Sequence, residues 1–337
     1  MRTFIKRALL GTLLAGGITL LGATVANAAE TNGDDGLLSG TQAALDVTLP
    51  VTISGTSLSV IGDSSSEQAA TAAPAPAPAP AASTDGSDGA ASGTQALVTV
   101  AAPVTVSGNS VSVVGDSASS DAATTAPSSP SGSSGSASTS GSDGLLSGTQ
   151  GLVSVNVPVT VSGNAISVAG DSESSDAQTA SGSSGAGTAP AAETDGSDSV
   201  AGGTQVVAPV TAPVTVSGNA ISVLGDSSSE GATTGTGSTG TGTAPEGWTD
   251  GSDGVLGGTQ VIAPVTAPIT AGGNAVSVIG DSSSAGTSST GTSGGGSGTD
   301  AQTGGEDSIG GGTQVIAPVT APVTAGGNAV SVIGDSS

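Results

Sequence analysis

The chain has almost none of the side chains on which most enzymes and metal sites depend. Its 337 residues include no cysteine, histidine or tyrosine, one tryptophan, one phenylalanine, and three basic residues against 27 acidic ones. Without cysteine and histidine, neither a disulfide framework nor a thiolate or imidazole metal site can form. The many serines have no histidine to activate them as nucleophiles. We therefore expect no enzyme activity and no cofactor.

The three basic residues all lie at the start of the chain, and this placement predicts secretion. Arg2, Lys6 and Arg7 precede an apolar stretch from Ala8 to Leu21, which is followed by Ala26-Asn27-Ala28. This order is typical of a secretory signal peptide over residues 1–28, cleaved after Ala28. The alternative is an uncleaved anchor. We expect a secreted chain without a transmembrane span, held non-covalently at the cell surface or cell wall.

Removal of the leader would leave a chain with no positive side chain. Such a chain cannot neutralise phosphate groups, so nucleic-acid binding is not expected. The remaining partners are a second copy of the chain, a hydrophobic surface or the cell wall.

One phrase recurs six times after the leader. Each copy begins at Gly-Thr-Gln and closes at Gly-Asp, with 22 positions from Thr to Asp, and copies start 53 to 55 positions apart. A constant interior between variable spacers indicates a tandem array. We expect repeats over 36–66, 89–117, 144–172, 199–227, 254–282 and 309–337. The linkers would be 67–88 (Ala/Pro-rich), 118–143 (Ser/Gly-rich), 173–198, 228–253 (Gly/Thr-rich) and 283–308 (Gly/Ser-rich), which have few apolar groups and should be flexible and disordered.

The fourth copy contains two alternating segments around a turn signal. Val214–Val216 and Ile221–Val223 alternate Val or Ile with Thr or Ser, and Gly218-Asn219 lies between them. Gly-Asn between two such segments favours a two-residue β-hairpin. The predicted fold is mostly β and disordered, with six short β-hairpin repeats joined by flexible low-complexity linkers. The expected turn residues are Gly108, Asn109, Gly163, Asn164, Gly218, Asn219, Gly273, Asn274, Gly327 and Asn328.

Each hairpin would have one apolar face. A lone two-stranded hairpin is marginal in water, so this face needs a partner: another repeat, another molecule or a nonaqueous surface. The expected assembly face consists of Val104, Val106, Val111, Val113, Val159, Val161, Ile166, Val168, Val214, Val216, Ile221, Val223, Ile269, Val276, Val278, Val323, Val330 and Val332.

The segment Pro213–Gly225, Pro-Val-Thr-Val-Ser-Gly-Asn-Ala-Ile-Ser-Val-Leu-Gly, resembles the chaplin domain, in tandem and without its cysteines. Ser54, Ser107, Ser162 and Ser217 stand where many chaplins have the first cysteine. The resemblance implies a surface-active protein that assembles into amyloid-like films and assists attachment.

Two functional hypotheses follow. The first is a secreted, cell-surface-associated structural protein that assembles through amphipathic β-hairpins into surface-active films and aids adhesion. The second is a soluble multivalent adhesin, a cell-wall-binding repeat array, in which the lone Trp248 would be incidental. Acidic turns such as Asp85–Gly89 and Asp250–Gly254 leave calcium binding open, since hard cations prefer carboxylate oxygens.

Overall fold

The structure, a computed structural model, describes residues 18–20, 29–32, 40–72, 81–90, 92–125, 136–146, 148–181, 191–236, 246–290 and 301–337. Within these ranges the chain consists of strands and turns, with no helix. The expected all-β character is therefore confirmed. The expected cleavage site, most of the leader and part of each expected linker lie outside the described residues. No helix in the described part is long and apolar enough to cross a membrane.

The strands form six sheets, which we number I to VI in the order in which each repeat passes through them. Sheet I contains β2 (Ala29–Asn32), β8 (Ala82–Asp85), β14 (Ser136–Ser140), β20 (Ala191–Asp195), β26 (Gly247–Asp250) and β33 (Ala301–Thr303). Sheet II contains β3 (Gln42–Thr48), β9 (Gln95–Ala101), β15 (Thr149–Asn156), β21 (Thr204–Thr211), β27 (Thr259–Ile262), β34 (Gln314–Ile316) and the short β28 (Val265–Thr266) and β35 (Val319–Thr320). Sheet III contains β1 (Ile18–Leu20), β4 (Val51–Ser54), β10 (Val104–Ser107), β16 (Val159–Ser162), β22 (Val214–Ser217), β29 (Ile269–Gly272) and β36 (Val323–Gly326).

The other three sheets follow further along each repeat. Sheet IV contains β5 (Ser57–Ile61), β11 (Ser110–Val114), β17 (Ala165–Ala169), β23 (Ala220–Leu224), β30 (Ala275–Ile279) and β37 (Ala329–Ile333). Sheet V contains β6 (Ser64–Glu67), β12 (Ser117–Ser120), β18 (Ser172–Ser175), β24 (Ser227–Glu230) and β31 (Ser282–Ala285). Sheet VI contains β7 (Ala70–Ala72), β13 (Ala123–Thr125), β19 (Gln178–Ser181), β25 (Thr233–Thr236) and β32 (Ser288–Thr290).

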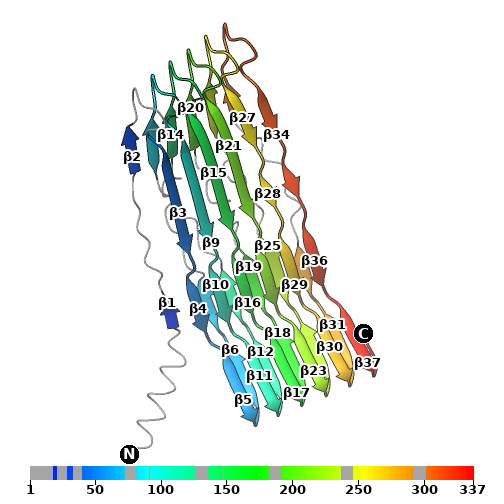
Figure 1. The fold of residues 1–337 in the computed structure, drawn as a ribbon. Helices are drawn as coiled ribbons and strands as arrows, with labels where there is room; N and C mark the ends of the chain where they lie inside the picture. The colour runs from blue at the N-terminus through cyan, green and yellow to red at the C-terminus, as the bar shows by residue number, and fades with distance from the viewer. Residues whose placement is uncertain are drawn as a thin grey trace, which may run out of the picture.

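Apart from β1, which pairs antiparallel with β4, neighbouring strands in every sheet come from successive repeats. They pair in parallel and in register, so that Thr160 pairs with Thr215 and Ser167 with Ser222. Each repeat therefore forms one layer of a stack, which we call a rung, and the colour runs in chain order across the stack in Figure 1. The described residues of rungs 1 to 6 are 29–32 with 40–72, 81–90 with 92–125, 136–146 with 148–181, 191–236, 246–290 and 301–337. Parallel strands lie about 4.8 Å apart, so equivalent residues of successive rungs are in contact.

Each full rung folds back on itself at a Gly-Asp corner. The chain passes through sheets II, III and IV, turns, and returns through V and VI, so that two layers face each other through their side chains. Ser64 Oγ of sheet V lies 2.6 Å from Ser110 Oγ of sheet IV, and Thr124 Oγ1 of sheet VI lies 2.7 Å from Ser162 Oγ of sheet III. Each of these bonds joins residues of two neighbouring rungs, so these bonds also stabilise the stack along its axis.

The structure corrects the expected hairpins. β22 and β23, the two halves of the expected hairpin in the fourth copy, belong to different sheets and pair with the equivalent strands of rungs 3 and 5. The other copies have the same arrangement. A hairpin bonds along one edge of each strand only, whereas an inner strand of the stack bonds along both edges to an almost identical neighbour.

Parts of the expected linkers are also ordered. Residues 118–143 contribute strands to sheets V, VI and I, and so do residues 173–198. The repeating unit of the structure is therefore longer than the 22-position motif.

The interior of the stack is polar and much of its outside is apolar. Thr215, Ser217 and Ser222 are buried, whereas the alternate residue Val223 is 40% exposed. In-register stacking permits this arrangement, because many of the buried hydroxyls bond to other hydroxyls or to a carbonyl group. A small apolar core between sheets I and II consists of Ala82, Leu97, Ala137, Leu152, Ala192, Val207 and Ile262.

Two serines of β24 provide a matched test of the polar interior. Ser227 and Ser229 are both buried, but Ser229 Oγ donates to Gly218 O at 2.7 Å, whereas Ser227 Oγ has no partner among the described residues. We expect Ser229→Ala to lower the free energy of unfolding by about 1–3 kcal/mol, because the Gly218 carbonyl loses its partner. Ser227→Ala removes the same atom and should leave stability unchanged or slightly higher. Urea unfolding followed by circular dichroism measures both; equal losses would contradict this account.

Candidate functional site

The residues expected to form an assembly face lie on the outer side of two neighbouring sheets. Those of sheet III are Val104, Val106, Val159, Val161, Val214, Val216, Ile269 and Val323, and those of sheet IV are Val111, Val113, Ile166, Val168, Ile221, Val223, Val276, Val278, Val330 and Val332. None of them is buried. Their sheet neighbours in β4 and β5 add Val51, Ile53, Leu58 and Val60. We call the whole set the outer apolar face.

The additional members of this face had a signal in the sequence. Leu58 and Val60 occupy the same repeat positions as Ile221 and Val223, but the first copy has Gly55-Thr56 in place of Gly-Asn, so its hairpin signal was weaker. The stack does not depend on that turn type, because Leu58 pairs with Val111 of the next rung.

The expected turn residues form bends between sheets III and IV. Their glycines have positive φ, from 61° at Gly108 to 69° at Gly327, which glycine adopts without strain. The asparagines stack in a ladder: Asn219 Nδ2 donates to Asn164 Oδ1 at 2.8 Å, and Asn274 Nδ2 donates in turn to Asn219 Oδ1 at 2.8 Å. The turn signal therefore marks a bend, and the asparagine bonds the rungs together.

A second amide ladder runs through the space between sheets I and II. Gln150 Nε2 donates to Gln95 Oε1 at 2.8 Å, and Gln205 Nε2 donates to Gln150 Oε1 at 3.0 Å and to Thr194 Oγ1 at 3.0 Å. These glutamines are buried. They are the glutamines of the Gly-Thr-Gln motif that begins each copy. The sequence signal for this ladder is that glutamine occupies the same position in all six copies, although a side chain exposed to solvent could vary there.

The closing aspartates form a ladder at the solvent-exposed corner. Asp171 N donates to Asp116 Oδ1 at 2.9 Å, and Asp226 N donates to Asp171 Oδ1 at 2.8 Å. The carboxylates are exposed and one follows another in successive rungs. Repulsion between them opposes stacking and is screened by salt.

The acidic turns use their first carboxylate within the turn. Asp85 Oδ1 accepts from Ser87 N at 3.1 Å and from Ser87 Oγ at 2.8 Å, and Asp250 does the same with Ser252. The second aspartates, such as Asp88 with φ of 56°, occupy the left-handed region that Asp tolerates. No group of three or more potential metal ligands was found in the described part of the chain.

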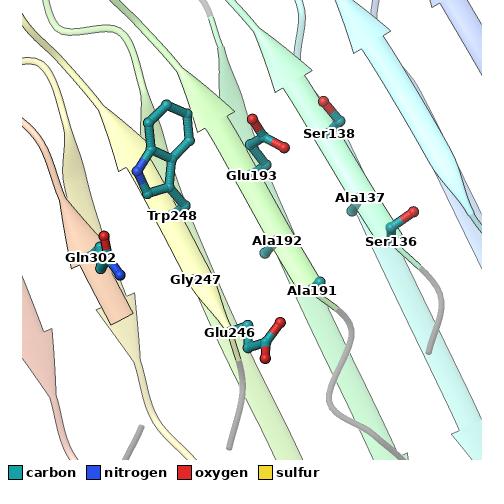
Figure 2. Close-up of a pocket in the computed structure, with 10 residues that line it drawn as sticks. All are labelled: Ser136, Ala137, Ser138, Ala191, Ala192, Glu193, Glu246, Gly247, Trp248 and Gln302. Carbon is teal, nitrogen blue, oxygen red and sulfur yellow. The ribbon is translucent and has the colours of Figure 1, made fainter. Parts of the chain in front are cut away.

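A shallow groove of about 530 Å³ lies on sheet I and surrounds the single tryptophan. Figure 2 shows the indole of Trp248 on the same side of the sheet as the carboxylate of Glu193. Register pairing places Ser138, Glu193, Trp248 and Gln302 in one row across four strands. Trp248 is 41% exposed, so an aromatic surface and a carboxylate face solvent together.

Comparison with known proteins gives one partial match. A family model described as ChpA-C matches residues 118–180 and 235–291, which together are well under half of the chain. No curated protein and no solved structure matches. The expected resemblance to the chaplin domain is corrected by this finding, since the similarity found is to ChpA-C. Both matched segments begin inside expected linkers, where sheets V and VI take their strands, so the similarity is not confined to the 22-position motif.

Proposed function

We propose that the chain is a secreted structural protein of the cell surface that assembles through its β-sheets into surface-active, amyloid-like films and aids adhesion. The observation that carries this proposal is the outer apolar face on a stack whose interior polar groups are largely bonded to one another. No catalytic group or cofactor enters the proposal.

The stack has the features that favour cross-β assembly. Its strands in sheets III and IV are uncharged and pair with identical or similar residues. The bends between these two sheets contain an asparagine ladder like those that stabilise fibrils. A soluble domain normally buries its Val and Ile residues and leaves Ser and Thr outside. In sheets III and IV this order is reversed, so a boundary with air, lipid or another stack would remove exposed Val and Ile side chains from water.

The outer apolar face also suits a boundary because it is continuous. Ile166, Ile221 and Val276 follow one another across three rungs, and Val168, Val223 and Val278 form the parallel row. Extended apolar patches on soluble proteins usually mark an interaction surface.

Replacing both rows tests the role of this face. In the chain of residues 29–337, we expect Ile166, Val168, Ile221, Val223, Val276 and Val278, each changed to Thr, to leave the β-type circular dichroism in place, since Thr is also β-prone. The fall in air–water surface tension at equal concentration should be smaller than that of wild type, because six side chains at the centre of the outer apolar face become polar. Pendant-drop tensiometry measures it.

The matched control changes the outer side of sheet I instead, with Ser138→Thr, Glu193→Thr and Gln302→Thr, and should retain the wild-type surface tension. If the six-residue variant lowers surface tension as strongly as wild type, the outer apolar face has no part in surface activity. Fibre diffraction of the dried wild-type protein should show spacings of about 4.7 and 10 Å.

The second candidate function is binding to cell-wall glycan. The exposed Trp248 in the groove of sheet I favours it, because an aromatic ring on an open surface is a suitable platform for a sugar ring. A pull-down on purified cell wall separates the two functions: retention that is lost in Trp248→Ala, with surface activity intact, supports the glycan site.

A further inference from the structure

The described part of the stack has unpaired strand edges at both ends. Among the described residues, sheets II and IV end in β3 and β5 on one side and in β34 and β37 on the other. Side chains at the ends are more exposed than their counterparts inside: Leu58 is 74% exposed against 37% for Ile221, and Val332 is 70% exposed against 40% for Val223. Unpaired edges of this kind are templates for pairing with another chain.

The two ends are complementary because the amide ladders have one direction. Every amide-to-amide step is a donation to the preceding rung, from Gln95 onward in the glutamine ladder and from Asn164 onward in the asparagine ladder. The last steps are Gln314 Nε2 to Gln260 Oε1 at 2.7 Å and Asn328 Nδ2 to Asn274 Oδ1 at 2.8 Å. The ladder therefore ends on rung 6 with the amide oxygen of Gln314. It begins on rung 1 with Gln42, whose Oε1 accepts from Gln95 Nε2 at 2.9 Å.

The backbone has the same complementarity. Val104 N donates back to Pro50 O at 2.8 Å, and Val104 pairs with Val51, so the N–H of Val51 points away from rung 2 toward the open edge. At the other end Ala275 N donates forward to Asn328 O at 2.8 Å and Ala275 pairs with Ala329, so the N–H of Ala329 points beyond rung 6.

The sequences of the two end rungs also match in register. Continuing the stack would place Val323 beside Val51 and Thr324 beside Thr52 in sheet III. In sheet IV it would place Ser331 beside Ser59 and Ile333 beside Ile61. These are the same like-on-like neighbours that hold the inner rungs together.

The edge of rung 1 already accepts a strand in this structure. β1, from the expected leader, pairs antiparallel with β4, with Ile18 opposite Ile53 and Leu20 opposite Val51. Loss of the leader would free this edge at the position where a parallel strand could bind.

We propose that rung 6 of one molecule pairs with rung 1 of a second molecule, in parallel and in register, so that molecules add end to end. This inference rests on the proposed function and specifies its contact. The two surfaces differ, and such a head-to-tail contact does not close on itself, so it generates a filament whose axis is the stack axis.

Two proline variants of the chain 29–337 test the contact. Each removes one backbone N–H that points out of the stack, and neither removes a hydrogen bond within the molecule. Val51→Pro blocks the rung 1 edge, and Ala329→Pro blocks the rung 6 edge. Each variant alone should sediment as a monomer with wild-type circular dichroism under conditions in which wild type forms filaments. An equimolar mixture should form dimers and nothing longer, since only one compatible pair of edges remains.

Cysteine cross-linking gives an independent measurement that does not depend on proline. The chain has no cysteine, so the single variants Ile61→Cys and Ile333→Cys introduce the only thiols. Neighbouring strands about 4.8 Å apart are within the range of a disulfide. Mixed and oxidised, the two variants should give a covalent heterodimer, whereas Leu45→Cys of sheet II with Ile333→Cys should not.

The outcomes separate this contact from the proposed function. Filaments formed by either proline variant alone, together with absence of the heterodimer, would overturn end-to-end pairing and leave assembly through the outer apolar face standing. A wild-type chain that neither lowers surface tension nor forms filaments would overturn both proposals.

Discussion

Gly225→Ala should disrupt the stack at rung 4. Gly225 turns the chain at the Gly-Asp corner with φ of 141°, a conformation that L side chains rarely adopt. A Cβ added there would also collide with the carbonyl group of Gly170 in the rung below. Backbone strain and overpacking together should cost about 2–6 kcal/mol. Urea unfolding followed by circular dichroism should show a lower midpoint, and hydrogen exchange should show lost protection concentrated in rungs 3 to 5.

Gly151→Ala is the matched control. Gly151 lies in β15 between Ala96 and Val206, and a Cβ there has no neighbour closer than 4.0 Å, the carbonyl oxygen of Gln95. Because glycine is less favourable than alanine within a strand, this variant should be as stable as wild type or slightly more so. A similar loss in both variants would mean that the corner is not what constrains the stack.

Gln205→Glu should destabilise the stack at neutral pH and much less in acid. The new carboxylate would be buried and would lose the Nε2 that donates to Gln150 Oε1 and Thr194 Oγ1. The described residues include no basic side chain with which it could pair. An uncompensated buried charge of this kind costs about 3–5 kcal/mol. Urea unfolding of variant and wild type, compared at each pH, measures the loss.

The pH dependence follows from burial, which raises the pKa of the new carboxyl above its unfolded value of about 4.3. Below that value both states are protonated, and the protonated acid can donate a hydrogen bond, so the difference from wild type should nearly vanish. It should grow as the pH rises through 4.3 and be complete above the raised folded pKa. Gln302→Glu, on the exposed side of sheet I, is the control and should change stability little at any pH. A loss independent of pH would show that the glutamine ladder is not desolvated in solution.

Local features of the fold could be predicted from the sequence. The alternation in Val214–Val216 and Ile221–Val223 correctly indicates strands and identifies side chains that share one side of sheets III and IV. The glycine of Gly218-Asn219 has the positive φ that the turn signal implies. Both depend on a few adjacent residues, which is why a single repeat is enough to predict them.

The pairing partner could not be predicted, because two solutions satisfy the same local pattern. Folding about Gly218-Asn219 would place Val216 opposite Ile221, while stacking places Val216 beside Val161 and Ala271. The stacked arrangement is the more stable one because it forms bonds between repeats, such as the ladders of Asn219 and Gln205, that a single repeat cannot form.

The strands within the expected linkers could not be predicted from a pattern of apolar residues. Ser227–Glu230 contains no apolar residue, and its place in the stack comes from polar contacts such as that of Ser229 with the carbonyl of Gly218. Composition distinguishes a chain that can bury hydrocarbon from one that cannot. Composition does not indicate that hydroxyl groups will find hydrogen-bond partners, because these partners are present only when several repeats stack.

The uniform register of the rungs has a consequence for how this architecture changes in evolution. Duplicating or deleting one whole copy alters the height of the column by a single strand spacing, about 4.8 Å, and leaves its cross-section and its two terminal layers as they were. The length of the stack is therefore set by the number of repeats, whereas its cross-section and the surfaces along its sides stay the same.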